Sequence, residues 1–96
     1  QILIIYSPVP SEKIFAWEQM AAASCTGFAL ILGAYTLGFG AVWKSFAYNP
    51  GSRLKKFLGL TADEQFLGWV NIGTEKDRDP SEREPLDLKK YAKFLS

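Results

Sequence analysis

The residues with the clearest potential for chemistry are main-chain groups in the stretch Gly38-Phe39-Gly40-Ala41-Val42-Trp43-Lys44-Ser45. Two glycines one residue apart allow a tight turn, because glycine adopts backbone angles that other residues resist. The Ala-Val-Trp that follows is typical of a strand. A glycine-rich phosphate loop would lead into a helix instead, so that motif does not match. The stretch therefore predicts an extended segment whose N–H groups could face a ligand.

Side-chain chemistry is restricted by what the sequence lacks. The chain has no histidine, so it can build neither a Ser-His-Asp triad nor a histidine metal site. Its one cysteine, Cys25, cannot form a zinc cluster or an internal disulfide, and it is interpreted as a small buried side chain in a reducing compartment. We predict no catalytic side chain and no metal site. If the protein is an enzyme, a cofactor must supply the difficult chemistry.

The composition describes a small domain with a large apolar content. The chain has 96 residues, of which 48% are hydrophobic and 15% aromatic. So many rings require either a partner surface or a missing piece of the same fold. The net charge of +1 gives no electrostatic reason to expect nucleic acid binding. We therefore expect residues 1–96 to form a single, partial domain.

The first half predicts a strand followed by one long helix. The run from Ile2 to Tyr6 is strand-like and is not a signal peptide, since it lacks a basic start and a cleavage site. A lone strand needs neighbours for its backbone groups, so we expect a fragment or a truncated relative of a larger domain. Ser11 is a suitable N-cap for a helix from Glu12 to about Leu37.

This helix is apolar on every face, which predicts burial on every face. No charged residue occurs between Glu18 and Lys44, so a membrane span is an alternative. The apolar part proper, Gly27 to Leu37, is too short to cross a bilayer comfortably, and a central helix of a soluble core is favoured. The small residues Ala23 and Gly27 then indicate close helix packing, across a subunit interface.

The second half begins with a loop and a short helix. Asn49-Pro50-Gly51 predicts the loop, and Ser52 can cap a helix over Arg53–Leu58 that ends at Gly59. Leu54, Phe57 and Leu58 are expected on its buried side, with its three basic residues in water.

A strand and an arm complete the chain. The strand is predicted over Gln65–Thr74, with bulky residues on both faces, which suggests an interior position in a sheet. Gly68 and Gly73 are expected where another backbone or a ligand comes close. Residues 75–96 are expected to form an extended C-terminal arm with a short helix from Leu86 to Ser96. The inward residues of that helix would be Leu88, Tyr91, Ala92 and Leu95.

The order of these motifs resembles the C-terminal half of nitroreductase-family flavin enzymes. An apolar helix leads into Leu-Gly-Phe-Gly-Ala-Val-Trp-Lys-Ser, then Asn-Pro, a short helix with Leu-Gly-Leu, and Phe-Leu-Gly-Trp-Val-Asn-Ile-Gly-Thr. The resemblance runs from about Trp17 to Pro85 and is strongest to the short single-domain branch of the family. It implies an α+β nitroreductase-like fold, here its C-terminal half, with a central apolar helix and mainly antiparallel strands.

The resemblance also implies an FMN site at the interface of an intertwined homodimer. In the family, the segment matching Val42, Trp43, Lys44 and Ser45 lies beside the isoalloxazine ring, with main-chain N–H groups directed at N5 and O4. Lys44 stands where many relatives have arginine, and it offers a point charge instead of a planar fork. In the alternative interpretation, Trp43 belongs to the core and Lys44 to the surface.

Arg83 is the second cofactor-binding position that the resemblance implies. Basic residues in the matching C-terminal arm of the family hold the FMN phosphate, a task that suits a guanidinium group. Glu82 and Glu84 flank Arg83 and would oppose a dianion unless they point away. An exposed, ion-pairing arginine is the alternative.

The implied reaction is a ping-pong transfer from NAD(P)H through flavin N5 to a nitroaromatic, quinone or similar small-molecule acceptor, in the cytoplasm. The family's other flavin ligands would lie upstream of Gln1, so this chain would hold part of the site and need a homodimer partner or a complementary N-terminal fragment. Two alternatives remain open: a non-catalytic dimerisation remnant of the fold, and a small single-span membrane protein.

Overall fold

Two helices, three strands and one short 3-10 turn make up the computed structural model, which describes residues 1–47, 51–77 and 82–95. In chain order they are β1 (Ile2–Tyr6), α1 (Ala16–Thr36), β2 (Gly40–Lys44), α2 (Gly51–Leu58), β3 (Gln65–Gly73) and the 3-10 turn η1 (Leu88–Lys90). All three predicted strands are present: the opening strand, the strand after the Gly38 turn and the strand after the short helix. The expected α+β architecture is confirmed.

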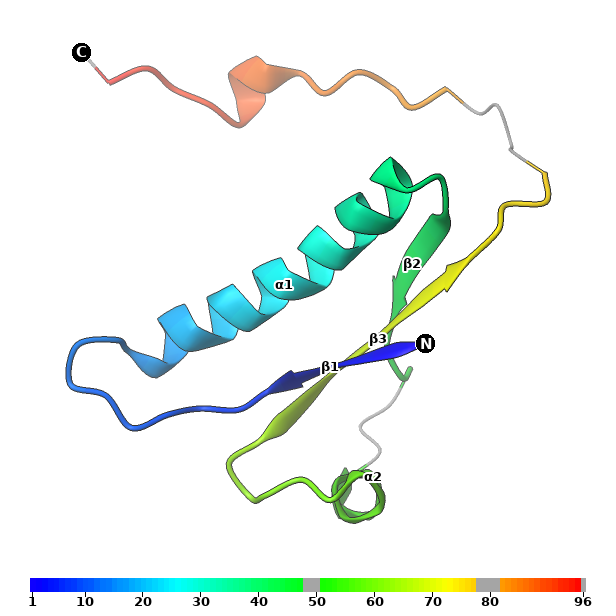
Figure 1. The fold of residues 1–96 in the computed structure, drawn as a ribbon. Helices are drawn as coiled ribbons and strands as arrows, with labels where there is room; N and C mark the ends of the chain where they lie inside the picture. Colours follow the sequence, from blue (N-terminus) through cyan, green and yellow to red (C-terminus); the bar gives the residue numbers. More distant parts are fainter. Residues whose placement is uncertain (48–50, 78–81, 96) are drawn as a thin grey trace.

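The three strands form one antiparallel sheet in the order β1-β3-β2 (Figure 1). β3 pairs with β1 on one side and with β2 on the other, so the predicted interior position of this strand is confirmed. The β1–β3 register shifts between the pairs Leu3↔Trp69 and Ile5↔Phe66. One residue of β1 therefore faces two residues of β3, which defines a β-bulge in the middle strand.

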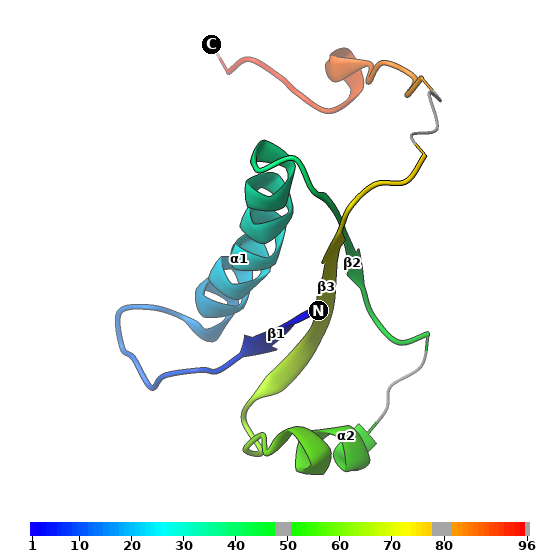
Figure 2. The same ribbon diagram turned by 45° about the vertical axis from the view of Figure 1, so that its right-hand side comes forward.

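Helix α1 covers one face of the sheet (Figure 2). The buried apolar side chains between the two layers are Ile4, Tyr6, Ala34 and Val70, with Val70 fully buried. The Tyr6 hydroxyl donates to the carbonyl of Ala16 at 3.2 Å and so ties the end of β1 to the start of the helix. The core is therefore a thin apolar layer between α1 and the three strands.

The start of α1 differs from the prediction, because Ser11 does not cap it. The Ser11 hydroxyl accepts hydrogen bonds from the amides of Lys13 and Ile14, at 3.2 and 3.1 Å, and closes a local turn. The helix begins after Phe15, whose amide donates to the Glu18 carboxylate at 2.8 Å. A serine that bonds the backbone two and three residues ahead makes a turn instead of a cap, and this moves the helix start to Ala16.

The short helix α2 begins at Gly51, and Asn49 and Pro50 of the predicted loop lie outside the described residues. Gly59 has a φ of 68°, and the Leu60 amide donates to the Lys55 carbonyl at 2.9 Å, so the predicted glycine stop is confirmed. The predicted buried side was wrong for Phe57, which is 84% exposed. None of the residues of α2 is buried in this chain, and Phe57 has no surface that covers it.

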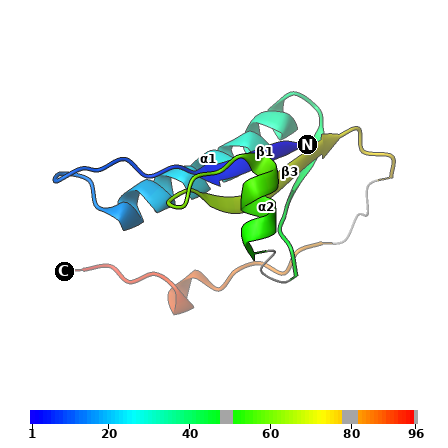
Figure 3. The same cartoon turned by 90° about the horizontal axis from the view of Figure 1, so that it is seen from below.

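The C-terminal helix predicted over Leu86–Ser96 was also wrong within the described residues. Residues 82–95 are extended apart from η1, and Leu88, Tyr91 and Leu95 are exposed. Figures 1 and 3 show this segment running apart from the sheet and α1. Such a short helix is unstable in water without tertiary contacts, and the segment makes none that would bury its apolar residues.

Most of α1 is not covered within this chain, contrary to the prediction of burial on every face. Its buried residues are Gly27 and Ala34, whereas Trp17, Phe28 and Tyr35 are well exposed. The Cα radius of gyration is 17.3 Å, compared with about 13 Å for a compact domain of 100 residues.

Within the described part of the chain, none of the helices combines the length and the apolar character that a membrane span requires. The described residues therefore contain no helix that would support the membrane-span alternative.

Candidate functional site

The predicted main-chain site lies on an edge strand. β2 pairs with β3 from Gly40↔Gly73 to Lys44↔Trp69, and within the described residues its other side has no strand neighbour. The turn before it is built on Gly38, whose φ of 84° confirms the predicted tight turn. An edge strand presents every second N–H group away from the sheet. The predicted segment can therefore offer donors to a ligand.

The direction of each amide follows from the carbonyl of Lys44. A Cβ atom built on Gly68 of β3 would collide with the Lys44 carbonyl oxygen, so this carbonyl faces β3. In a trans peptide the C=O and the next N–H point in opposite directions, so the Ser45 N–H faces the outer edge. Strand alternation then turns the amide of Trp43 outward and those of Val42 and Lys44 toward β3. Two of the four predicted residues thus present free-edge donors.

The side chain of Trp43 is half-buried and packs between β3 and α1. Its indole Nε1–H donates to the Leu67 carbonyl at 2.9 Å, and its six-membered ring lies directly against Gly27 of α1. A Cβ atom at Gly27 would come within 2.7 Å of that ring, so only glycine leaves enough room. The indole is thus half-buried between α1 and β3, in the direction of the alternative interpretation, and the assignment of Trp43 to the cofactor site stays a prediction.

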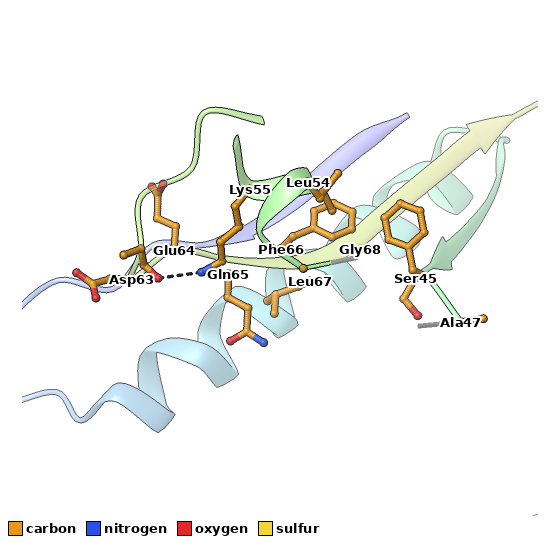
Figure 4. Close-up of a pocket in the computed structure, with 13 residues that line it drawn as sticks. Ser45, Ala47, Leu54, Lys55, Asp63, Glu64, Gln65, Phe66, Leu67 and Gly68 are labelled. Atoms are coloured by element: carbon orange, nitrogen blue, oxygen red, sulfur yellow. Dashed lines mark hydrogen bonds between the residues drawn. The ribbon is translucent and has the colours of Figure 1, made fainter. Parts of the chain in front are cut away.

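The other predicted residues line two separate surfaces. Val42 lines a shallow cleft of about 400 Å³ on the sheet face away from α1, together with Asn71. Ser45 lines a larger cleft of about 650 Å³ between the end of β2, α2 and the start of β3 (Figure 4). The Lys44 side chain is exposed, as the alternative for this residue expected. Ser45, whose amide faces the outer edge, therefore lies beside the larger cleft.

Three aromatic rings form an apolar wall beside Ser45, and the sequence analysis did not identify them. The ring centroid of Phe46 lies 5.9 Å from that of Phe66 and 5.2 Å from that of Trp69, and the last two are 6.1 Å apart. Phe66 and Phe46 line the cleft. The only available signal was the alternation of large residues along the predicted strand, which does not show that Phe46 joins them.

Two charged residues of the cleft, Lys55 and Glu64, form hydrogen bonds with the chain around the loop before β3. Lys55 Nζ donates to the Ala62 carbonyl at 2.8 Å (Figure 4), so this lysine is not free in water as predicted for the basic residues of α2. Glu64 accepts from the Thr61 amide at 2.8 Å and from the Ser7 hydroxyl at 2.9 Å. These two hydrogen bonds, the Thr61 amide first, lower the pKa of Glu64. Both groups hold the loop in place.

No metal centre emerges from residues 1–47, 51–77 and 82–95, where no group of three metal-ligating side chains comes together. Cys25 is exposed on α1, so its predicted burial was wrong. In this stretch of the helix the sheet contacts run along the Gly27 side, which leaves the thiol outside.

The structure does not bring Arg83 to the other predicted residues. Arg83 is exposed in the extended segment 82–95. Because Gly73 pairs with Gly40, the chain leaves β3 beside the first residue of β2, at the opposite end from Ser45. The assignment of Arg83 to the FMN phosphate stays a prediction.

The known proteins with similar sequences that we compared are named as nitroreductases. The profile of the Nitroreductase family matches residues 2–74, so it also includes β1, ahead of the resemblance seen from Trp17 onward. The chain is 31% identical over 83 residues to the Haemophilus influenzae protein named "Putative NAD(P)H nitroreductase", a match that covers 86% of this chain and 45% of that protein. It is 26% identical over 73 residues to "Putative NAD(P)H nitroreductase YdjA" of Escherichia coli K12, covering 76% of this chain and 40% of that protein.

The chain thus spans less than half the length of these two relatives. Its three-stranded antiparallel sheet, its long helix and its family match agree with one another. We conclude that the chain belongs to the nitroreductase family.

Proposed function

We propose that this chain contributes main-chain donors to an FMN site in an NAD(P)H-dependent oxidoreductase of nitroreductase type. The observation that carries the proposal is the outward direction of the Trp43 and Ser45 amides at the free edge of β2, beside a cleft of about 650 Å³. The edge of a flavin ring offers acceptors at N5 and O4, so a fixed N–H donor directed at one of them fits its chemistry. Family membership and the names of the two relatives support the same activity.

When bound, FMN would accept a hydride from NAD(P)H and then pass electrons to a nitroaromatic, quinone or similar acceptor. The role of the chain is electrostatic. The amides of Trp43 and Ser45 would stabilise the negative charge that develops at the ring edge. Strand β2 holds the Trp43 amide, and the Lys44 carbonyl, which faces β3, fixes the peptide plane that carries the Ser45 N–H. The wall of Phe46, Phe66 and Trp69 would give a bound flavin an apolar neighbour next to Ser45, which would strengthen such interactions by lowering the local dielectric constant.

We further propose that the site is completed by a second copy of the chain or by a complementary N-terminal fragment, in the cytoplasm. The exposed side chains of Trp17, Phe28 and Tyr35 leave a large apolar face on α1, as expected of a surface that another polypeptide covers. Arg83 would reach the phosphate of FMN only through a different path of segment 82–95 or in a site shared between copies. Residues 1–96 would then be one partial domain with residues 75–96 as its arm.

A proline substitution tests the main-chain role directly. Ser45→Pro removes the outward N–H without touching the β2–β3 hydrogen bonds, and Lys44 before it is already in the extended conformation that proline requires. Loss of one donor should weaken FMN binding by roughly fivefold to tenfold. Ser45→Ala is the matched control, because it removes the hydroxyl and keeps the N–H.

The measurement is quenching of flavin fluorescence during titration of FMN with each purified protein, together with an absorbance spectrum. The proposal expects flavin absorbance in the wild-type protein and weaker binding for Ser45→Pro than for Ser45→Ala. A stable, colourless wild-type dimer that does not take up added FMN would instead identify a non-catalytic dimerisation remnant. Equal FMN affinities of the two variants would show that the Ser45 amide does not bind FMN.

A further inference from the structure

The middle strand is interrupted beside the last residue pair of β2. Gly68 is buried and has a φ of 108°, a left-handed conformation that side-chain-bearing residues rarely adopt. Leu67 and Gly68 together face the single residue Ile4 of β1, which places the β-bulge of β3 at these two positions. The β2–β3 ladder ends at Lys44↔Trp69, so the next position on β3 is Gly68 itself. The bulge therefore marks the point where β2 leaves the sheet.

The Trp43 indole holds this bulge in place. Its Nε1–H donates to the Leu67 carbonyl at 2.9 Å, and a Cβ atom at Gly68 would lie 2.8 Å from Nε1. The Leu67 carbonyl belongs to the peptide that precedes Gly68, so the φ angle of Gly68 sets its direction. On its other side the indole rests against Gly27, which prevents it from moving away. The indole, the bulge and helix α1 form one packed unit.

We propose that Gly68 and Trp43 are positioning residues that end the β2–β3 ladder at Lys44 and so keep the larger cleft open beside Ser45. The inference rests on the proposed function, because it assigns a cause to the space in which a flavin would meet the end of β2. A regular residue at 68 would let the ladder continue, since residues beyond Lys44 could then pair with β3. The Ser45 N–H would still face the outer edge, but the segment after Lys44 would lie against β3 and close the cleft between them. The bulge thus opens the binding space beside a donor whose direction strand alternation already fixes.

Gly68→Ala and Trp43→Phe test the two parts of the unit. Alanine at 68 must give up the positive φ and displace the Lys44 carbonyl. Phenylalanine at 43 keeps an aromatic ring and removes the bond to Leu67. Each variant should bind FMN about tenfold more weakly and give the bound flavin a more negative midpoint potential, because a closed cleft keeps the ring away from the Ser45 donor, which then stabilises the reduced ring less. Trp43→Phe keeps the test valid if Gly68→Ala does not fold.

Two control variants separate positioning from a general loss of stability. Gly73→Ala changes a glycine of the same strand whose added Cβ would meet no atom within 4 Å. Tyr6→Phe removes a hydrogen bond of the core at the far end of β1. Both controls should bind FMN within about twofold of the wild-type protein, with an unchanged midpoint potential, although Tyr6→Phe lowers the thermal stability.

The outcomes distinguish this inference from the proposed function. If wild-type protein binds FMN and both Gly68→Ala and Trp43→Phe bind it equally well at an unchanged potential, the positioning role is refuted alone. If Tyr6→Phe weakens binding as much as Trp43→Phe does, the bulge acts only through stability and the inference also fails. A wild-type protein that binds no FMN refutes the proposed function, and the positioning role with it.

Discussion

Replacing Gly27 by alanine places a methyl group against the Trp43 indole. The new Cβ would lie 2.7 Å from Cη2 and Cζ3 of the ring and 3.1 Å from Cε3. The indole cannot retreat freely, because its Nε1–H is bonded to the Leu67 carbonyl at 2.9 Å. The contact must therefore be relieved by moving α1 away from β2 or by breaking that hydrogen bond.

The expected size of the effect comes from two opposing terms. Alanine is favoured over glycine within a helix by about 1 kcal/mol, whereas an overpacked methyl group typically costs about 1 to 3 kcal/mol. Gly27→Ala should thus lower the free energy of unfolding by up to about 2 kcal/mol. Gly33→Ala on the same helix is the matched control, since its Cβ would meet no atom within 4 Å and only the propensity gain remains.

The assay is thermal and urea denaturation of both variants beside the wild-type protein. The two variants should differ by about 1 to 3 kcal/mol, and each kcal/mol shifts the melting temperature by roughly 4 to 8 °C in a domain of this size. Adding Trp43→Phe to Gly27→Ala should recover part of the loss, because the atoms in collision are gone. A Gly27→Ala protein at least as stable as Gly33→Ala would refute the packing that we describe.

Two further predictions concern hydrogen bonds. Tyr6→Phe removes the bond to the Ala16 carbonyl and should lower the free energy of unfolding by about 1 kcal/mol in urea denaturation; an unchanged value would mean that the bond contributes nothing. Glu64 has a lowered pKa because of Thr61 and Ser7, so its stabilising effect is complete above the unfolded value of about 4.3 and is lost as the pH falls through the lower folded value. Ser7→Ala should raise that pKa in an NMR titration, and no change would exclude the Ser7 bond.

The exposed face of α1 shows that a helix can be predicted correctly while the burial of its side chains is predicted wrongly. The sequence correctly predicts a long apolar helix, but Phe28 is 58% exposed and Cys25 lies outside the core. An apolar pattern reports only that a surface should leave water, and it does not say which polypeptide covers it. The same limit applies to Leu88 and Tyr91, whose apolar character predicts docking that the described chain does not provide.

Up to the end of β3, the sequence by itself determined the order of strands and helices, the glycine turn before β2, the interior place of β3 and the family that the chain resembles. These features depend on local backbone preferences and on runs of side chains adjacent along the chain, which a sequence displays directly. The tertiary structure alone decided that the Trp43 indole packs on Gly27 and that the amides of Trp43 and Ser45 face outward. Those outcomes depend on the register with β3 and on its bulge at Gly68, and pairing between strands distant in sequence is fixed only when their side chains meet.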